Sequence, residues 1–198
     1  MEYTYDRGKT RRLAGMAIFT AIVVVLQLLG SFIRFGPFSI SLVALPIVIG
    51  SAVYGAGAGL WLGVVFGFTV LLSGDAGAFL AVTPLGTIAV VLLKGSAAGL
   101  CAGLVYRLLA KKHEIPAGIA AAVVFPVVNT GIFLAACPLL YLDTVAGWAR
   151  GMGFGDNIGA YLIFGLVGGN FLFELGLDIV LIPVILRLIK LGKKERHT

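Results

Sequence analysis

The sequence predicts an all-α integral membrane protein built as a bundle of six transmembrane helices. Of its 198 residues, 60% are hydrophobic and 12% are charged, whereas a soluble domain carries about 25% charged residues. The apolar residues gather in runs, several of them long enough, at about 20 residues, to cross a bilayer. So much apolar surface requires lipid, and we expect a single membrane domain that covers 1–198.

The first three predicted spans lie at 13–33, 40–54 and 57–72, after a basic leader at 1–12. The first span is long enough to cross a bilayer, and a polar break with glycine and proline separates it from the second. Pro46 lies inside the second span and is expected to kink it. The second and third spans are short and rich in glycine, which predicts close packing and tilted or irregular helices.

The last three predicted spans lie at 85–109, 117–141 and 160–189, and a basic tail at 190–198 follows them. A proline stands at the first helical position before the fifth span, where its fixed φ and missing N–H are favourable. The segment at 142–157 is interpreted as the longest loop of the chain.

Lys and Arg residues are distributed unequally between the two predicted sides of the membrane. Of the fifteen, four lie in the leader, three at 107–112 and five from 187 to the end of the chain. Only Arg34 and Arg150 fall on the other side, and Lys94 lies inside the fourth span. Cytoplasmic loops carry the excess of Lys and Arg, so we expect both termini to be cytoplasmic.

Ionisable residues inside the predicted spans are the main functional signal. Asn170, Glu174 and Asp178 lie four residues apart, so a helix places them on one face with about 6 Å of rise between neighbours. A carboxylate near the bilayer centre costs about 2.5–3.5 kcal/mol, and its default explanation is a functional site facing the bundle interior. The alternative is that the acids pair with a buried base and only lock helices together. We favour the functional explanation for Glu174 and the structural one for Asp178.

Lys94 interrupts the fourth span about 15 Å from its start, near mid-membrane by the helical rise. It requires a counter-charge, and Glu174 on the sixth span is the candidate partner at a similar depth. Either the two residues neutralise each other, or the pair opens and Lys94 meets a carboxylate or oxygen of a ligand; both alternatives stay open. The buried polar set as a whole is Gln27, Lys94, Asn129, Thr130, Asn170, Glu174 and Asp178.

The motifs of several enzyme classes are absent from the sequence. It contains no G-x-x-x-x-G-K-[ST] phosphate loop, no H-E-x-x-H and no G-x-S-x-G, and its two cysteines and two histidines form no metal-ligating pattern. We therefore expect no catalytic residue, no metal and no cofactor. A pocket for a small hydrophilic molecule fits the buried polar set better than catalysis does.

A stripe of small residues runs along the first span. Ala17 and Ala21 form an A-x-x-x-A pair, and small residues at this spacing let another helix approach closely. From spacing alone, packing within the same protein is the favoured explanation.

Several segments together resemble the S components of energy-coupling factor (ECF) transporters. Residues 35–72, FGPFSISLVALPIVIGSAVYGAGAGLWLGVVFGFTVLL, resemble their second and third spans, in which a proline-containing span, a glycine-rich turn and a G-x-x-x-G-like span follow one another. The pair Ala17 and Ala21 resembles the first-span motif of the group. Three segments are similar to the pantothenate-type branch: LLKGSAAGLCAGLVYRLL from Leu92, the Asn129-Thr130 pair, and Asn170-x-x-x-Glu174.

The resemblance implies a six-helix substrate-binding subunit in a prokaryotic cell membrane. Such a subunit captures a vitamin or related micronutrient, here with pantothenate as the candidate and riboflavin or folate as alternatives. A separate coupling membrane protein and two ATPase subunits would supply ATP hydrolysis, so the chain itself would not be an enzyme, and the S component would topple to release its substrate inward.

The resemblance also implies roles for individual residues. Ala17 and Ala21 would contact the coupling protein. Substrate would bind in the outer half, among spans four to six. The candidate binding residues are Lys94, Asn129, Asn170 and Glu174 in the spans, and Arg34 and Trp148 in the loops.

A different class of function is a self-sufficient secondary carrier or channel for a small polar solute. Buried Lys94, Glu174 and Asp178 could then relay protons. Many secondary carriers are built from inverted repeats, and the sequence shows no clear halves.

Overall fold

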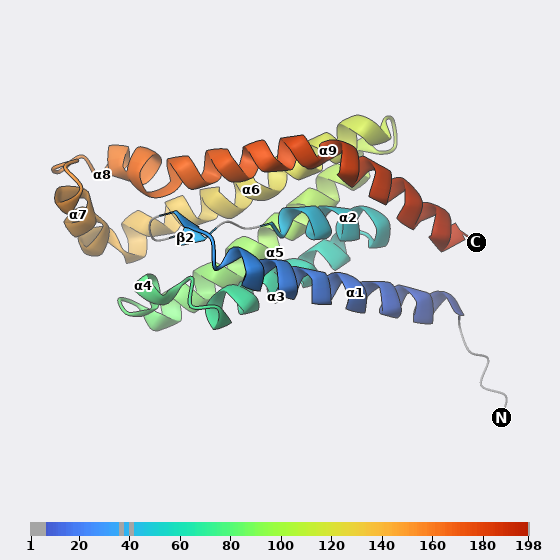
Figure 1. The fold of residues 1–198 in the computed structure, drawn as a ribbon, viewed down its shortest axis with the longest axis horizontal. Coiled ribbons are helices and arrows are strands. Elements are labelled where there is room, and N and C mark those ends of the chain that lie inside the picture. The colour runs from blue at the N-terminus through green and yellow to red at the C-terminus, as the bar shows by residue number, and fades with distance from the viewer. Residues whose placement is uncertain (1–6, 36–37, 40–41, 198) are drawn as a thin grey trace, which may run out of the picture.

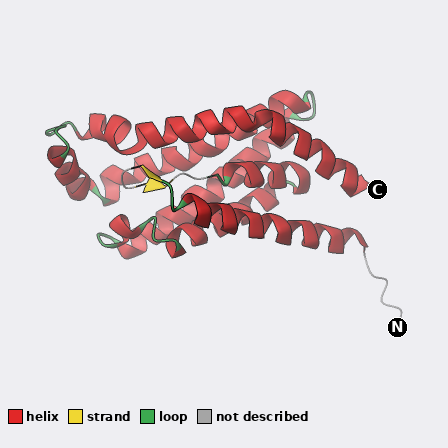
Figure 2. Ribbon diagram, viewed as in Figure 1, coloured by secondary structure: helices red, strands yellow, loops and turns green. Residues whose placement is uncertain are grey.

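The structure, a computed structural model, describes residues 7–35, 38–39 and 42–197. These residues form an elongated helical bundle with one short antiparallel hairpin (Figures 1 and 2). In chain order the elements are α1 (Arg7–Gly30), β1 (Arg34–Phe35), β2 (Phe38–Ser39), α2 (Ala44–Tyr54), α3 (Ala56–Leu72), α4 (Gly77–Leu80), α5 (Pro84–Leu109), α6 (Glu114–Leu140), α7 (Leu142–Gly151), α8 (Ile158–Ala160), the π-helix η1 (Tyr161–Val167) and α9 (Gly168–His197).

Within the described residues, three helices are long and apolar enough to cross a membrane. They are Gly8–Gly30 in α1, Pro84–Leu109 and Glu114–Leu140. The helices α2 and α3 and the segment Ile158–Val167 are shorter and also apolar. The architecture is that of an all-helical, multi-pass membrane bundle, which confirms this part of the prediction.

The two ends of the bundle carry different elements. The start of α1, the turn between α5 and α6, and the end of α9 lie at one end, and the hairpin, α4 and α7 lie at the other (Figure 1). The first end therefore holds the basic segments of the sequence. There Lys193 of α9 donates a hydrogen bond to Glu114 of α6, with 2.5 Å between Nζ and Oε1.

Glycines bring α3 and α5 into backbone contact. A Cβ added to Gly63 would lie 2.1 Å from the carbonyl oxygen of Gly95, and one added to Gly59 would lie 2.2 Å from that of Gly99. No side chain fits at such distances, so close approach here requires glycine, as in small-residue packing of membrane helices generally. Because α5 also packs extensively against α6, α3, α5 and α6 form one layer of adjacent helices.

The predicted loop at 142–157 is wrong in its first part, because Leu142–Gly151 forms α7. Val145 and Ala149 are buried and lie four residues apart, so the segment has one apolar face. Asp143 in its first turn and Arg150 in its last turn also suit the helix dipole. The polar and glycine residues of the segment hid this amphipathic spacing.

Two other boundaries differ from the prediction. The second span was expected from residue 40, but α2 begins at Ala44, after the hairpin. The sixth span was expected as one helix at 160–189. Instead it starts with the π-helical turn η1, and α9 continues into the basic tail as far as His197.

Candidate functional site

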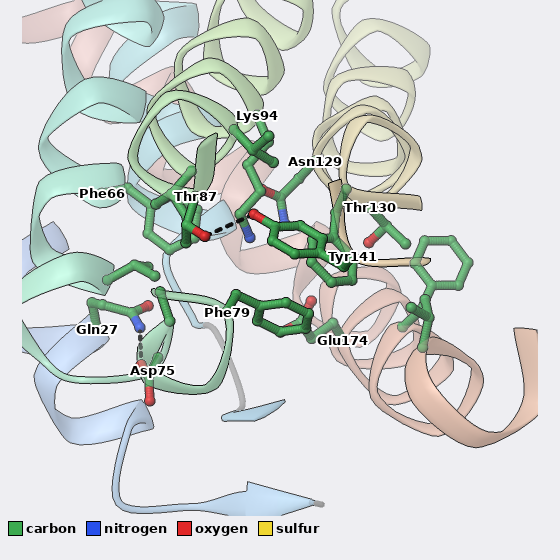
Figure 3. A pocket seen from close by; sticks show the side chains of 17 residues that line it. Gln27, Phe66, Asp75, Phe79, Thr87, Lys94, Asn129, Thr130, Tyr141 and Glu174 are labelled. Carbon is green, nitrogen blue, oxygen red and sulfur yellow. Dashed lines mark hydrogen bonds between the residues drawn. The ribbon is translucent and has the colours of Figure 1, made fainter. Parts of the chain in front are cut away.

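A cavity of about 90 Å³ opens between the two hydrophobic clusters of the bundle (Figure 3). On the same measure one water molecule needs about 10–15 Å³, so the space holds several waters or a small organic molecule. Its lining residues come from α1, α3, α5, α6, η1, α9 and the segments around α4 and after α6. They are Gln27, Phe66, Val70, Asp75, Ala76, Phe79, Thr87, Val90, Val91, Lys94, Asn129, Thr130, Phe133, Tyr141, Val167, Phe171 and Glu174.

Lys94 extends from α5 into this cavity between two aromatic rings. Its Nζ lies 5.8 Å from the ring centroid of Phe66 and 5.8 Å from that of Phe133. With the residues that the structure describes it forms neither an ion pair nor a hydrogen bond. Each cation–π contact contributes about 0.5–2 kcal/mol, whereas a lysine at the centre of a membrane helix costs about 2.5–3.5 kcal/mol. The two rings therefore offset much of this cost, but they do not accept the N–H groups of Lys94 in the way that an oxygen does.

Glu174 lines the same cavity from α9, but the direct ion pair with Lys94 that the sequence offered as one alternative is not formed. The two side chains interact electrostatically without coming within 4.0 Å, and Asp75 acts on the Lys94 charge in the same way. Glu174 and Asp178 are both buried, and their four-residue spacing places both on one face of α9, as predicted. Asp178 does not belong to the cavity lining.

Asn129 faces the cavity from α6, beside Lys94 of the adjacent helix α5 (Figure 3). Its side chain is 92% buried, since only 8% is exposed, and no donor in the described part of the chain bonds to its Oδ1. A buried carbonyl oxygen without a donor costs about 1–3 kcal/mol. Asn129 is therefore an acceptor that needs a donor from whatever fills the cavity. Its neighbour Thr130 also belongs to the lining.

A hydrogen-bonded network closes one side of the cavity. Gln27, near the end of α1, donates from Nε2 to Asp75 Oδ2 over 2.8 Å, and Ser73 Oγ donates to the same oxygen over 2.8 Å. Asp75 lies in the segment between α3 and α4, so this network attaches α1 to that segment (Figure 3). Gln27 is one of the buried polar residues expected from the sequence, whereas Asp75 was not expected at this site. The signal that could have found it is an acid next to an otherwise apolar span.

Thr87 and Tyr141 form a second polar contact in the cavity wall. Their hydroxyl oxygens are 2.8 Å apart and buried. This bond joins the first turn of α5 to the junction between α6 and α7. Nearby, Phe79 contacts Phe133 and Tyr141 edge-on, with centroid distances of 5.2 and 4.9 Å, so the wall on this side is aromatic.

The remaining predicted site residues are not part of the described lining. Trp148 lies on α7, and its ring packs edge-on against Phe79, 5.5 Å between centroids, so it supports the wall from behind. The side chains of Arg34 and Asn170 lie outside the described part of the structure. Ala17 and Ala21 are both exposed on α1, away from the cavity.

The fold and the cavity define a class: a multi-pass, all-helical membrane protein with polar side chains gathered in its interior. Residues 11–186 match the profile of the family described as "ECF transporter, substrate-specific component". The chain belongs to this family. Its members are transport subunits and not enzymes, and the family implies a small substrate and the partner proteins of an ECF module. No curated protein matches the chain.

Proposed function

We propose that this S component captures a small polar micronutrient in its internal cavity and delivers it to a coupling membrane protein and two ATPase subunits. A vitamin such as pantothenate is the candidate substrate, with riboflavin and folate as alternatives. In this proposal the chain crosses the membrane six times with both termini in the cytoplasm. The supporting observation is a cavity inside an apolar bundle whose wall contains Lys94, held between two aromatic rings, and a buried oxygen of Asn129 that no described donor reaches.

The proposed binding residues are Lys94, Asn129, Glu174 and Asn170. The first three line one cavity from α5, α6 and α9, and Asn170 precedes Glu174 by four residues on α9. Arg34 belongs to the hairpin that follows α1, and it is proposed as a contact at the mouth of the site. Trp148 is proposed to act indirectly, through the ring of Phe79 that forms the wall.

An uptake assay tests this function. Cells that carry the coupling protein and both ATPases are compared with and without this chain, and accumulation of labelled pantothenate, riboflavin and folate is measured. We expect uptake of one vitamin only when the chain is present. Equal uptake in both strains would rule out that vitamin. Gradient-driven uptake by liposomes that contain this chain alone would instead favour a self-sufficient carrier.

We further propose that α1 docks on the coupling protein through Ala17 and Ala21. Both residues are exposed and the helix around them is apolar, so a partner helix meets no side chain beyond a methyl group at either position. Ala17→Leu is expected to prevent copurification with the coupling protein while ligand binding is retained. Ala135→Leu, at an exposed alanine of α6, is the matched control. Normal copurification of the Ala17→Leu variant would contradict the docking proposal.

A further inference from the structure

We propose that the cavity selects a small monocarboxylate that also carries hydroxyl or N–H donors. This inference rests on the proposed function, because it takes the cavity to be the substrate site. It adds the chemical class of the substrate, which the family does not specify.

The requirement for an acceptor comes from Lys94. Its ammonium group lies in the cavity wall with aromatic rings on two sides, and no described residue accepts a hydrogen bond from it. The rings attract the charge but accept none of its N–H groups in the way that an oxygen does. A carboxylate satisfies both needs, because it carries the opposite charge and forms short, charge-assisted hydrogen bonds.

The requirement for hydroxyl or N–H donors on the ligand comes from a hydrogen-bond acceptor in the cavity wall. Asn129 Oδ1 is a buried acceptor that no donor in the described residues reaches. A ligand without hydroxyl or N–H groups would leave Asn129 unsatisfied, and a site built for a donor discriminates strongly against an analogue that lacks one.

The two acids at the cavity disfavour a ligand with more than one negative charge. Lys94 lines the cavity together with two acids, Glu174 and Asp75. A phosphate monoester would bring a charge of about −1.5 to −2 into a space of about 90 Å³ that already holds these two acids. Like charges at short range disfavour this binding. A monocarboxylate places its single charge at Lys94 and directs its donors toward Asn129 Oδ1.

The test compares carboxylates with neutral analogues of the same skeleton. The full chain is reconstituted in nanodiscs, and binding is measured by isothermal titration calorimetry. The probe pairs are pantothenate with panthenol and biotin with biotin amide, and 4′-phosphopantothenate, which carries a phosphate in addition to the carboxylate, is the more highly charged probe. The variants are Lys94→Met, which keeps the length and removes the charge, and Lys94→Arg, which keeps the charge. Lys111→Met, at an exposed position beyond α5, is the matched control, and thermal unfolding checks that each variant is folded.

For at least one pair we expect the carboxylate to bind about tenfold or more tightly than its neutral partner, and the phosphate probe to bind more weakly than pantothenate. Lys94→Met is expected to bring the ratio within the pair close to one, and Lys94→Arg and Lys111→Met to preserve it. Asn129→Leu is expected to weaken both members about tenfold and to leave their ratio unchanged. This difference separates the charge contact of Lys94 from the donor contact of Asn129.

Tighter binding of the neutral member, or an unchanged ratio in Lys94→Met, would overturn the inference while the proposed function stands. If no probe binds, the small molecule that copurifies with the protein is identified by mass spectrometry. A copurifying carboxylate that is lost from Lys94→Met supports the inference, and a copurifying molecule without a carboxyl group overturns it. Absence of both probe binding and a copurifying molecule would overturn the inference together with the proposed function.

Discussion

Substitution of Gly63 by alanine tests whether α3 and α5 are held in backbone contact. The added Cβ would lie 2.1 Å from the carbonyl oxygen of Gly95, about 1.3 Å short of an ordinary contact at 3.4 Å. A flexible side chain would move aside, but the obstacle here is the main chain of α5, so the two helices must separate. Overpacking of this kind costs about 1–3 kcal/mol, and we expect a value near the upper limit.

The assay is thermal and denaturant unfolding of the purified protein in detergent, followed by tryptophan fluorescence. Gly57→Ala is the matched control, because Gly57 lies on the same helix and a Cβ there meets nothing within 4 Å. We expect the control to be at least as stable as the unsubstituted protein, since alanine favours a helix over glycine. Equal unfolding midpoints for Gly63→Ala and Gly57→Ala would refute the backbone contact.

Two further substitutions test contacts at opposite ends of the bundle. Lys193→Met removes the partly exposed ion pair with Glu114, whose side chains are 31% and 45% exposed, and is expected to lower the unfolding free energy by less than about 1 kcal/mol. Burial lowers the pKa of Lys193, but the hydrogen bond to Glu114 and the nearby Tyr106 outweigh it and raise that pKa above 10.5. The stabilisation is therefore complete below pH 10.5 and is lost as the pH rises through the higher pKa of the folded state. Unfolding measured across this range should show that the free-energy difference between the variant and the unsubstituted protein shrinks only in strong alkali. A difference that disappears near neutral pH would contradict the role of the ion pair. Thr87→Val leaves the buried hydroxyl of Tyr141 without its partner and is expected to lower the free energy of chemical unfolding by about 1–3 kcal/mol. Thr87→Ser keeps the hydrogen bond and is the control. A valine variant as stable as the serine variant would contradict the contribution of this bond.

The long helices were readable from the sequence for a simple physical reason. The apolar runs that became α5 and α6 extend over 26 and 27 residues, and only a helix satisfies its own backbone groups over such a length in lipid. The helix α7 was missed because it has only ten residues and mixes polar with apolar side chains. The spacing of its apolar residues stabilises a helix only when the face that they form packs against the end of the bundle.

Part of the cavity lining could also be predicted from the sequence on physical grounds. Lys94, Asn129 and Glu174 stand out because a polar group inside an apolar run is costly, and all three line one space. Asp75 and Phe66 could not be assigned to it from the sequence. An acid in a loop normally faces water and a phenylalanine in a span normally faces lipid, so only the packing of distant segments brings them to the same wall.

Because Gln27 bonds to Asp75, the exposed surface of α1 at Ala17 and its cavity-lining surface at Gln27 cannot move independently. Ten residues separate Gln27 from Ala17, about 15 Å along the axis, and a helix is stiff over this length. Tilting or sliding the lipid-facing half of α1 must therefore either pull the segment that carries Asp75 with it or break the bond across the 2.8 Å gap. In both cases an event on the outside of the bundle changes the shape of its interior.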